Sequence, residues 1–137
     1  MAIRFFSEGI LFSVSYPQKT RRWINSCANR EKRTIRDLNY IFCDDNFLLG
    51  VNQKYLQHDD LTDIITFQLN NDPIEGEIYI SIDRVRENAK NLSIDPQDEL
   101  HRVMIHGVLH MMGYRDKLPS EKAIMRKKEE ACLSLRR

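Results

Sequence analysis

The chain has 137 residues, of which 42% are hydrophobic and 30% are charged, and its formal net charge at pH 7 is +1. These values exclude a disordered chain, and no run approaches the ~18 apolar residues that a membrane-spanning helix needs. The length predicts one domain over residues 1–137, and three widely spaced cysteines without a signal-peptide pattern predict free thiols in a cytoplasmic protein.

Apolar runs and turn residues predict the elements of the first half. Residues 2–6 and 10–15 carry short apolar runs that are typical of strands. A helix is expected from Pro17 to about Arg33, because proline is favoured in the first helical turn and an apolar stripe follows it. The next predicted elements are a strand at 34–44 and a helix at 45–56.

The second half predicts two strands followed by three helices. Turn residues at 70–73 separate β-branched, apolar runs at 62–69 and 77–82. Proline and acidic residues in the first turn open a helix at 96–112. The other two helices are expected at 83–91 and 119–135. The fold class is therefore α+β, a small mixed β-sheet packed with helices, with the helix at 96–112 in a central position.

The segment HGVLHMMGYRD carries the candidate metal ligands. His106 and His110 lie about 40° apart around a helix axis and roughly 6 Å apart along it, so both rings can reach one ion. Gly113 can adopt the left-handed conformation that ends a helix and turns the chain back. Asp116 can then supply a third ligand. Three protein ligands leave a position for a water, which is typical of a catalytic metal site.

Chance histidines in a buried helix are the competing interpretation. The helix is rich in apolar residues, and a lone buried histidine is more often a hydrogen-bonded core residue than a ligand. The glycine turn and the well-spaced carboxylate favour the metal site. Metzincin proteases share this spacing in H-E-x-x-H-x-x-G-x-x-H, but Gly107 replaces the glutamate that is their general base. A metzincin-like metalloprotease therefore stays an alternative function, but the chain lacks the glutamate that such a protease uses as its general base.

Three segments resemble conserved blocks of a known family. HGVLHMMGYRDK resembles the signature H-G-x-L-H-L-x-G-Y-D-H of the YbeY family. VNQKYLQHDDLTDIITF at 51–67 resembles the block L-N-x-x-Y-R-x-x-x-x-P-T-D-V-L-S-F, and GEIYIS at 76–81 resembles G-D-I-x-I-S. The three blocks occur in the family's order and cover most of residues 50–117.

The resemblance implies a single-strand-specific, metal-dependent endoribonuclease. It implies action in maturation of the 3′ end of 16S ribosomal RNA and in ribosome quality control, with one divalent ion, usually zinc, held by three histidines. The expected partners are single-stranded ribosomal RNA, ribosomal subunits and assembly proteins, without a membrane. A non-catalytic RNA-binding assembly factor with a structural metal is the alternative from another class.

Two residues depart from the family pattern. Asp116 stands at the third histidine, which gives a His-His-Asp site of lower charge that still suits zinc or a harder ion. Leu56 stands where the family has an arginine suited to phosphate, so another cation would have to bind the phosphate. Asn52 and Thr62 match the pattern. If Asp116 is not a ligand, His58 is the first residue to consider in its place.

Charge is segregated along the chain. Residues 17–36 hold seven basic residues and one acidic residue, a net +6, and residues 117–137 hold seven and three, a net +4. Residues 57–100 hold three basic and eleven acidic residues, a net −8. The basic segments can form a positive face for an RNA backbone, or they can simply be solvated helix faces.

Further residues are candidates for supporting roles. Tyr55, Phe67 and Tyr114 can stack on unpaired bases, although Phe67 within a β-run also suits a core. Asp63 can hold a metal histidine by a hydrogen bond, or can be an ordinary carboxylate at the end of a strand. A metal-bound water is the first candidate nucleophile. His101 is a less favourably placed candidate for proton transfer, about 140° from the first metal histidine around the helix axis.

Overall fold

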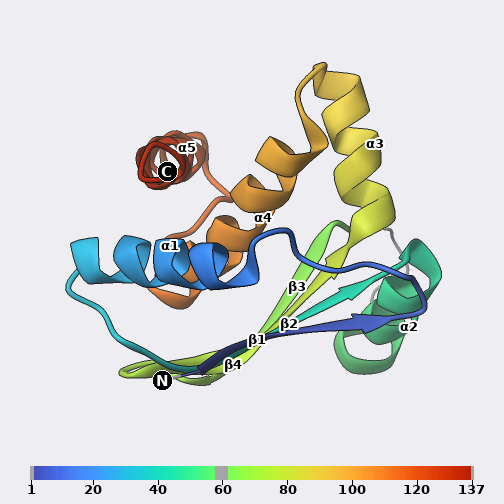
Figure 1. The fold of residues 1–137 in the computed structure, drawn as a ribbon, viewed down its shortest axis with the longest axis horizontal. Helices are drawn as coiled ribbons and strands as arrows, with labels where there is room; N and C mark the ends of the chain where they lie inside the picture. The colour runs from blue at the N-terminus through green and yellow to red at the C-terminus, as the bar shows by residue number, and fades with distance from the viewer. Residues whose placement is uncertain (1, 58–61, 137) are drawn as a thin grey trace.

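A four-stranded mixed sheet forms the base of the molecule (Figure 1). The computed structural model describes residues 2–57 and 62–136. The strand order is β1-β2-β4-β3, in which the first three strands are parallel and β3 runs antiparallel to β4. The strands are β1 (Ala2–Glu8), β2 (Ile35–Cys43), β3 (Ile64–Asn70) and β4 (Ile74–Ser81). The predicted α+β class is confirmed.

The helices cover both faces of this sheet. They are α1 (Pro17–Arg30), α2 (Asp45–Leu56), α3 (Ile82–Leu92), α4 (Pro96–Met111) and α5 (Pro119–Leu133). Helix α4 packs on β3 and β4 and also contacts α1, α3 and α5, so its predicted central position is confirmed (Figure 1). On the opposite face, α2 places Leu48 and Val51 against Cys43 and Ile65. None of the described helices combines the length and apolarity needed to cross a bilayer.

The strand predicted at residues 10–15 is wrong. This segment is irregular and follows Gly9, whose φ is +73°. Because β1 and β2 are parallel, the chain must cross back over the sheet through α1, and residues 10–15 lead into that crossover. Phe12 packs on Phe42, whereas Leu11 is fully exposed. A short apolar run of this kind does not distinguish a strand from an irregular segment that packs one or two side chains on the hydrophobic core.

Two boundaries differ from the prediction because local pairing decides them. Helix α1 ends at Arg30, three residues early, since Lys32 takes a left-handed conformation with φ of +57°. Strand β4 starts three residues earlier than expected, at Ile74, which pairs with Ile35 of β2 and donates its N–H to Thr34 at 2.8 Å. The remaining helices and strands agree with the predicted ranges to within two residues.

Two glycines allow close packing between elements of the core. A Cβ at Gly107 would lie 2.9 Å from Ile78 Cδ1 and 3.0 Å from Ile64 Cδ1, so α4 rests directly on β3 and β4. A Cβ at Gly76 would lie only 2.4 Å from the backbone oxygen of Phe67 in the neighbouring strand. A larger residue at Gly107 would require Ile78 and Ile64 to move, and one at Gly76 would collide with the backbone of β3.

The substitution Gly76→Ala should destabilise the fold, because the added methyl group meets backbone rather than a movable side-chain end. We expect a loss of about 1–3 kcal/mol in the free energy of unfolding, as for other overpacked sites. Urea denaturation measures it. The matched control is Gly50→Ala in α2, where a Cβ meets nothing within 4 Å; helix propensity should there give a gain of about 0.5–1 kcal/mol. Equal stability of the two variants would contradict the packing at Gly76.

Candidate metal centre

The end of α4 positions the candidate ligands. The helix starts with an Asp95 cap, whose side chain accepts the Gln97 N–H at 2.7 Å. It closes at Gly113, whose φ is +105°. The Gly113 N–H donates to His110 O at 2.9 Å and the Tyr114 N–H donates to Leu109 O at 3.1 Å. These two bonds form a Schellman motif. The predicted glycine turn is confirmed, and it directs the chain back over the histidines.

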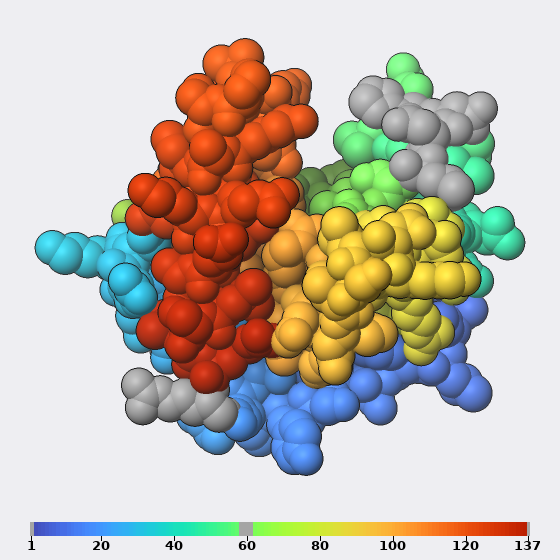
Figure 2. Space-filling view, turned by 90° about the horizontal axis from the view of Figure 1, so that it is seen from above, coloured from blue at the N-terminus to red at the C-terminus, as the bar shows by residue number. Residues whose placement is uncertain are grey.

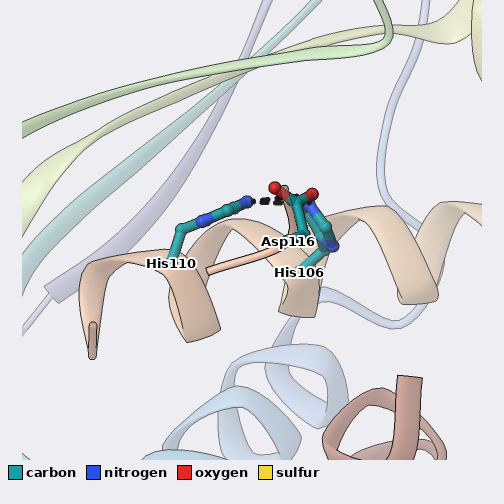
Figure 3. A group of neighbouring side chains, drawn as sticks. All are labelled: His106, His110 and Asp116. Atoms are coloured by element: carbon teal, nitrogen blue, oxygen red, sulfur yellow. Dashed lines mark hydrogen bonds and ion pairs between the residues drawn. The ribbon is translucent and has the colours of Figure 1, made fainter. Parts of the chain in front are cut away.

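Asp116 returns to the two histidines, as the sequence spacing predicted (Figure 3). The Nε2 atoms of His106 and His110 lie 3.0 Å apart, and Asp116 Oδ2 lies 3.2 Å and 3.4 Å from them. Ligand bonds of about 2.0–2.1 Å to a tetrahedral ion place neighbouring ligand atoms about 3.3 Å apart. The observed separations lie close to this value, so the donor set fits one divalent ion.

The three side chains open into a cleft. Thr62, Asp63, Ile64 and Thr66 line it together with the ligand triad, and its volume is about 460 Å³. Figure 2 shows a hollow between α5 and the green strand β3. The His106 side chain is 14% exposed, and those of His110 and Asp116 are 30% and 37% exposed. An ion held there would remain open to solvent and to a substrate.

A buried carboxylate from α5 fixes the first histidine. Glu129 Oε2 lies 2.5 Å from His106 Nδ1, while Glu129 Oε1 accepts from Arg102 Nη1 at 3.3 Å. With Nδ1–H donating to Glu129, the neutral His106 ring leaves its Nε2 lone pair free for an ion. Arg102 also donates to Glu99, a fully buried carboxylate, at 2.7 Å, and this bond raises the pKa of the guanidinium.

Glu129 was missed in the sequence because nothing local marks it. It lies 23 residues after His106, and only the packing of α5 on α4 brings the two together. Asp63, the residue considered for this role, lies in the cleft wall instead and accepts from Asn88 Nδ2 at 3.4 Å. Burial raises the pKa of the Asp63 carboxyl. A carboxyl of this kind beside a metal can exchange a proton with a reacting group.

His101 lies away from the metal ligands. Its ring packs on Trp23 with centroids 5.1 Å apart, and its Nδ1 accepts from Arg136 Nη1 at 2.8 Å. Burial and then the charge of Arg136 lower the pKa of His101 to about 4. The residue lines a different pocket from the ligand triad. We therefore assign it no part in proton transfer at the metal.

The three aromatic candidates are also placed outside the cleft lining. Tyr55 in α2 is 60% exposed and meets Phe67 edge-on, with centroids 5.8 Å apart. Phe67 also contacts Tyr79 on the face of the sheet that α2 covers. Tyr114 donates its hydroxyl to Glu31, and Lys128 lies 5.3 Å from its ring centroid. Tyr55 keeps the largest free surface of the three.

The positions compared with the family pattern fall in different surroundings. Asn52 is buried in α2, Thr62 lies in the cleft wall, and Leu56 is exposed at the end of α2. Among the cleft residues that the structure describes, none is a lysine or an arginine. Arg115 and Lys117 are exposed on either side of Asp116 and are the nearest cations in the sequence. His58 lies outside the described residues.

The two basic segments meet in space. The Trp23 Nε1–H donates to Cys132 O at 2.7 Å, and Lys128 Nζ lies 2.8 Å from Glu31 Oε2. Not every cation in them faces solvent. Arg21 donates to Ile3 O at 2.7 Å and is held in this way against β1. Arg22 is exposed, so it belongs to the part of the basic surface that an RNA backbone could reach.

The contact of Glu129 with His106 predicts an effect on metal affinity. Replacing Glu129 with Gln removes the charge that holds Nδ1–H, and we expect metal affinity to fall by about 10–100-fold, as is typical when such a carboxylate is lost. Competition between the protein and a zinc-binding dye measures this change. Glu130→Gln is the matched control, because Glu130 is the exposed neighbour in the same helix. Equal affinities of the two variants would show that Glu129 does not position the ligand.

Comparison with known proteins identifies the family of the chain. The family profile "Endoribonuclease YbeY" matches residues 8–136. The chain is 49% identical over 137 residues to the protein of that name from Cytophaga hutchinsonii, with 98% of this chain and 96% of the relative covered. The relative of that name from Bacteroides thetaiotaomicron is 41% identical over 137 residues, with 99% and 100% covered. The solution structure of TM1509 from Thermotoga maritima superposes with a TM-score of 0.71 at 25% identity, over 98% of this chain and 88% of that one. The chain belongs to the YbeY family.

Proposed function

We propose that the chain is a metal-dependent endoribonuclease that cleaves single-stranded RNA. We further propose that residues 1–137 form one domain and that the protein is cytoplasmic. Its substrate would be the 3′ end of 16S ribosomal RNA, and it would also take part in ribosome quality control. Ribosomal subunits and assembly proteins are its further partners. Two findings support the proposal: the full-length similarity to proteins named endoribonucleases, and the converging His106, His110 and Asp116.

The observation that carries the proposal is the position of the ligand triad in an open cleft. One divalent ion, with zinc as the expected metal, would polarise a phosphate oxygen and activate a water for attack on phosphorus. His106, His110 and Asp116 would hold it, and Glu129 keeps the first histidine in the required orientation. Apart from the three ligands, Asp63 is the ionisable side chain among the described residues of the cleft wall, and it can transfer a proton there.

The charge distribution supports an RNA substrate. Arg115 and Lys117 are exposed next to Asp116, and each can pair with a phosphate of a strand entering the cleft. The cations of α1 and α5 continue this positive surface, since the two helices lie together. In the family pattern an arginine stands at the position of Leu56. We assign the phosphate contact to Arg115 and Lys117 in its place.

The metalloprotease alternative is disfavoured by position 107. The glutamate that a metzincin carries there is Gly107, and a side chain at this residue would collide with Ile78 and Ile64. A side chain at this position would require the ends of Ile78 and Ile64 to move, and the chain carries no glutamate at the position of the metzincin base. The second alternative, an assembly factor with a purely structural metal, predicts a different response to ligand substitution.

The double substitution His106→Ala and His110→Ala should reduce bound metal from one ion per chain to none and should abolish RNA cleavage. Elemental analysis and a cleavage assay on a single-stranded RNA, with and without chelator, measure the two effects. His101→Gln in the same helix is the control for metal content, because His101 lies in another pocket. Stoichiometric metal in the double variant would refute the site.

Asp116→Ala discriminates between a catalytic and a structural ion. Asp116 is 37% exposed and follows the helix, so its loss should leave the fold intact. For a nuclease we expect a loss of cleavage of at least about 100-fold, because even the loss of a residue that only supports a metal ligand typically costs about 10–100-fold. RNA binding and thermal unfolding should be nearly unchanged. Loss of folding and RNA binding together would instead favour the structural metal. Full metal content and activity would show that Asp116 is not a ligand.

A further inference from the structure

A second cavity lies on the other side of α4, between the start of α1 and the end of α5. Its volume is about 560 Å³, which is within the range of about 300–1,000 Å³ typical of small-molecule sites. It has no residue in common with the metal cleft. The residues that define its chemistry are Tyr16, Lys19, Trp23, Gln97, His101 and Arg136.

The cavity combines aromatic surface with positive charge. Trp23, which is 5% exposed, and His101 form its floor with ring centroids 5.1 Å apart and planes tilted by 44°, and Tyr16 at the mouth is 78% exposed. Lys19 and Arg136 bring two cations, and none of the described lining residues is acidic. Asp98 pairs with Arg136 at 3.0 Å from outside the lining, but its side chain is 53% exposed, so solvent weakens this pair.

Hydrogen-bonding groups complete the site. Arg136 donates to His101 Nδ1, so this nitrogen is an acceptor and the neutral ring carries its proton on Nε2. Gln97 Nε2 lies 3.1 Å from His101 Nε2, and because that ring nitrogen carries the proton, the Gln97 amide takes the flipped orientation in which its oxygen accepts. The amide nitrogen of Gln97 is then free to meet a polar edge. Arg136 uses Nε toward Leu133 O at 3.1 Å and Nη1 toward Asp98 and His101, and Nη2 has no partner among residues 2–57 and 62–136.

We propose that this cavity binds one nucleotide of a single-stranded RNA, outside the metal cleft. The base packs on the exposed ring of Tyr16 and reaches the edges of Trp23 and His101 at the floor of the cavity, and the Gln97 amide meets the base edge. Lys19 and Arg136 bind the phosphate. The identity of the ligand rests on the proposed action on RNA, but binding here requires neither the metal nor cleavage.

The chain has a single tryptophan, and it lines this cavity, so its fluorescence reports binding directly. The full-length protein is titrated with AMP, UMP, inorganic phosphate and a single-stranded hexaribonucleotide. We expect a saturable change with the nucleotides, tighter binding of the hexamer than of AMP, and no change with inorganic phosphate. The double variant His106→Ala and His110→Ala should respond like the unmodified protein, although it cannot cleave RNA.

Charge-matched variants then test the phosphate contacts. Lys19→Gln should weaken hexamer binding by at least about tenfold, because a hydrogen bond to a charged group is lost. Lys90→Gln on α3, an exposed lysine outside both cavities, removes the same charge and should have no effect. Arg136→Gln should act like Lys19→Gln; circular dichroism checks that the end of α5 stays folded.

Three results would overturn the proposal. They are a fluorescence signal that does not saturate with any nucleotide, equal hexamer affinities of Lys19→Gln and Lys90→Gln, and a response to free AMP without one to the hexamer. Each is independent of the cleavage assay. A protein that cleaves RNA but gives no fluorescence response would retain the proposed function and lose this nucleotide site. A protein that gives the fluorescence response but does not cleave RNA would retain the nucleotide site and lose the proposed function.

Discussion

The seating of α4 on the sheet is the constraint on which both cavities depend. Gly107 lets the helix rest against Ile78 and Ile64, and the Tyr40 hydroxyl donates to Met104 O at 2.9 Å inside the core. A helix held this closely cannot rotate, because its packed face and its polar face are both fixed. His106 and His110 therefore face the cleft. The arrangement of the two candidate ligands on α4 is a consequence of core packing.

The buried charges around α4 form a chain in which every member has a partner. Glu99 is fully buried, Arg102 joins it to Glu129, and Glu129 reaches His106. Removing a charge from water costs several kcal/mol unless hydrogen bonds replace the lost hydration. Here Arg102 supplies those bonds to both carboxylates. The network adds little to the free energy of folding, because the cost of desolvation offsets the attraction between the charges. Its effect is to hold one imidazole nitrogen toward the cleft.

The sequence was informative where spacing along one helix determines geometry. The histidines, the glycine turn and Asp116 lie within eleven residues, so helix geometry alone brought them together. The α+β class and most element ranges followed from periodicity and turn residues. Glu129 and the second cavity could not be predicted, since both depend on where α5 docks. The strand expected at residues 10–15 could not be excluded from the sequence either, because the crossover through α1 follows from the parallel pairing of β1 with β2.

The two ends of α4 show how one residue type acquires two roles from its neighbours. His106 faces a carboxylate, Glu129, which fixes its Nδ1–H and leaves Nε2 as a lone-pair donor toward an ion. His101 faces a cation, Arg136, which donates to its Nδ1 and leaves Nε2–H as a hydrogen-bond donor. Burial and Arg136 hold the pKa of His101 near 4, so the ring stays neutral at physiological pH. The partner on Nδ1 therefore decides whether a histidine of this helix is suited to bind a metal or to bind a neutral polar group.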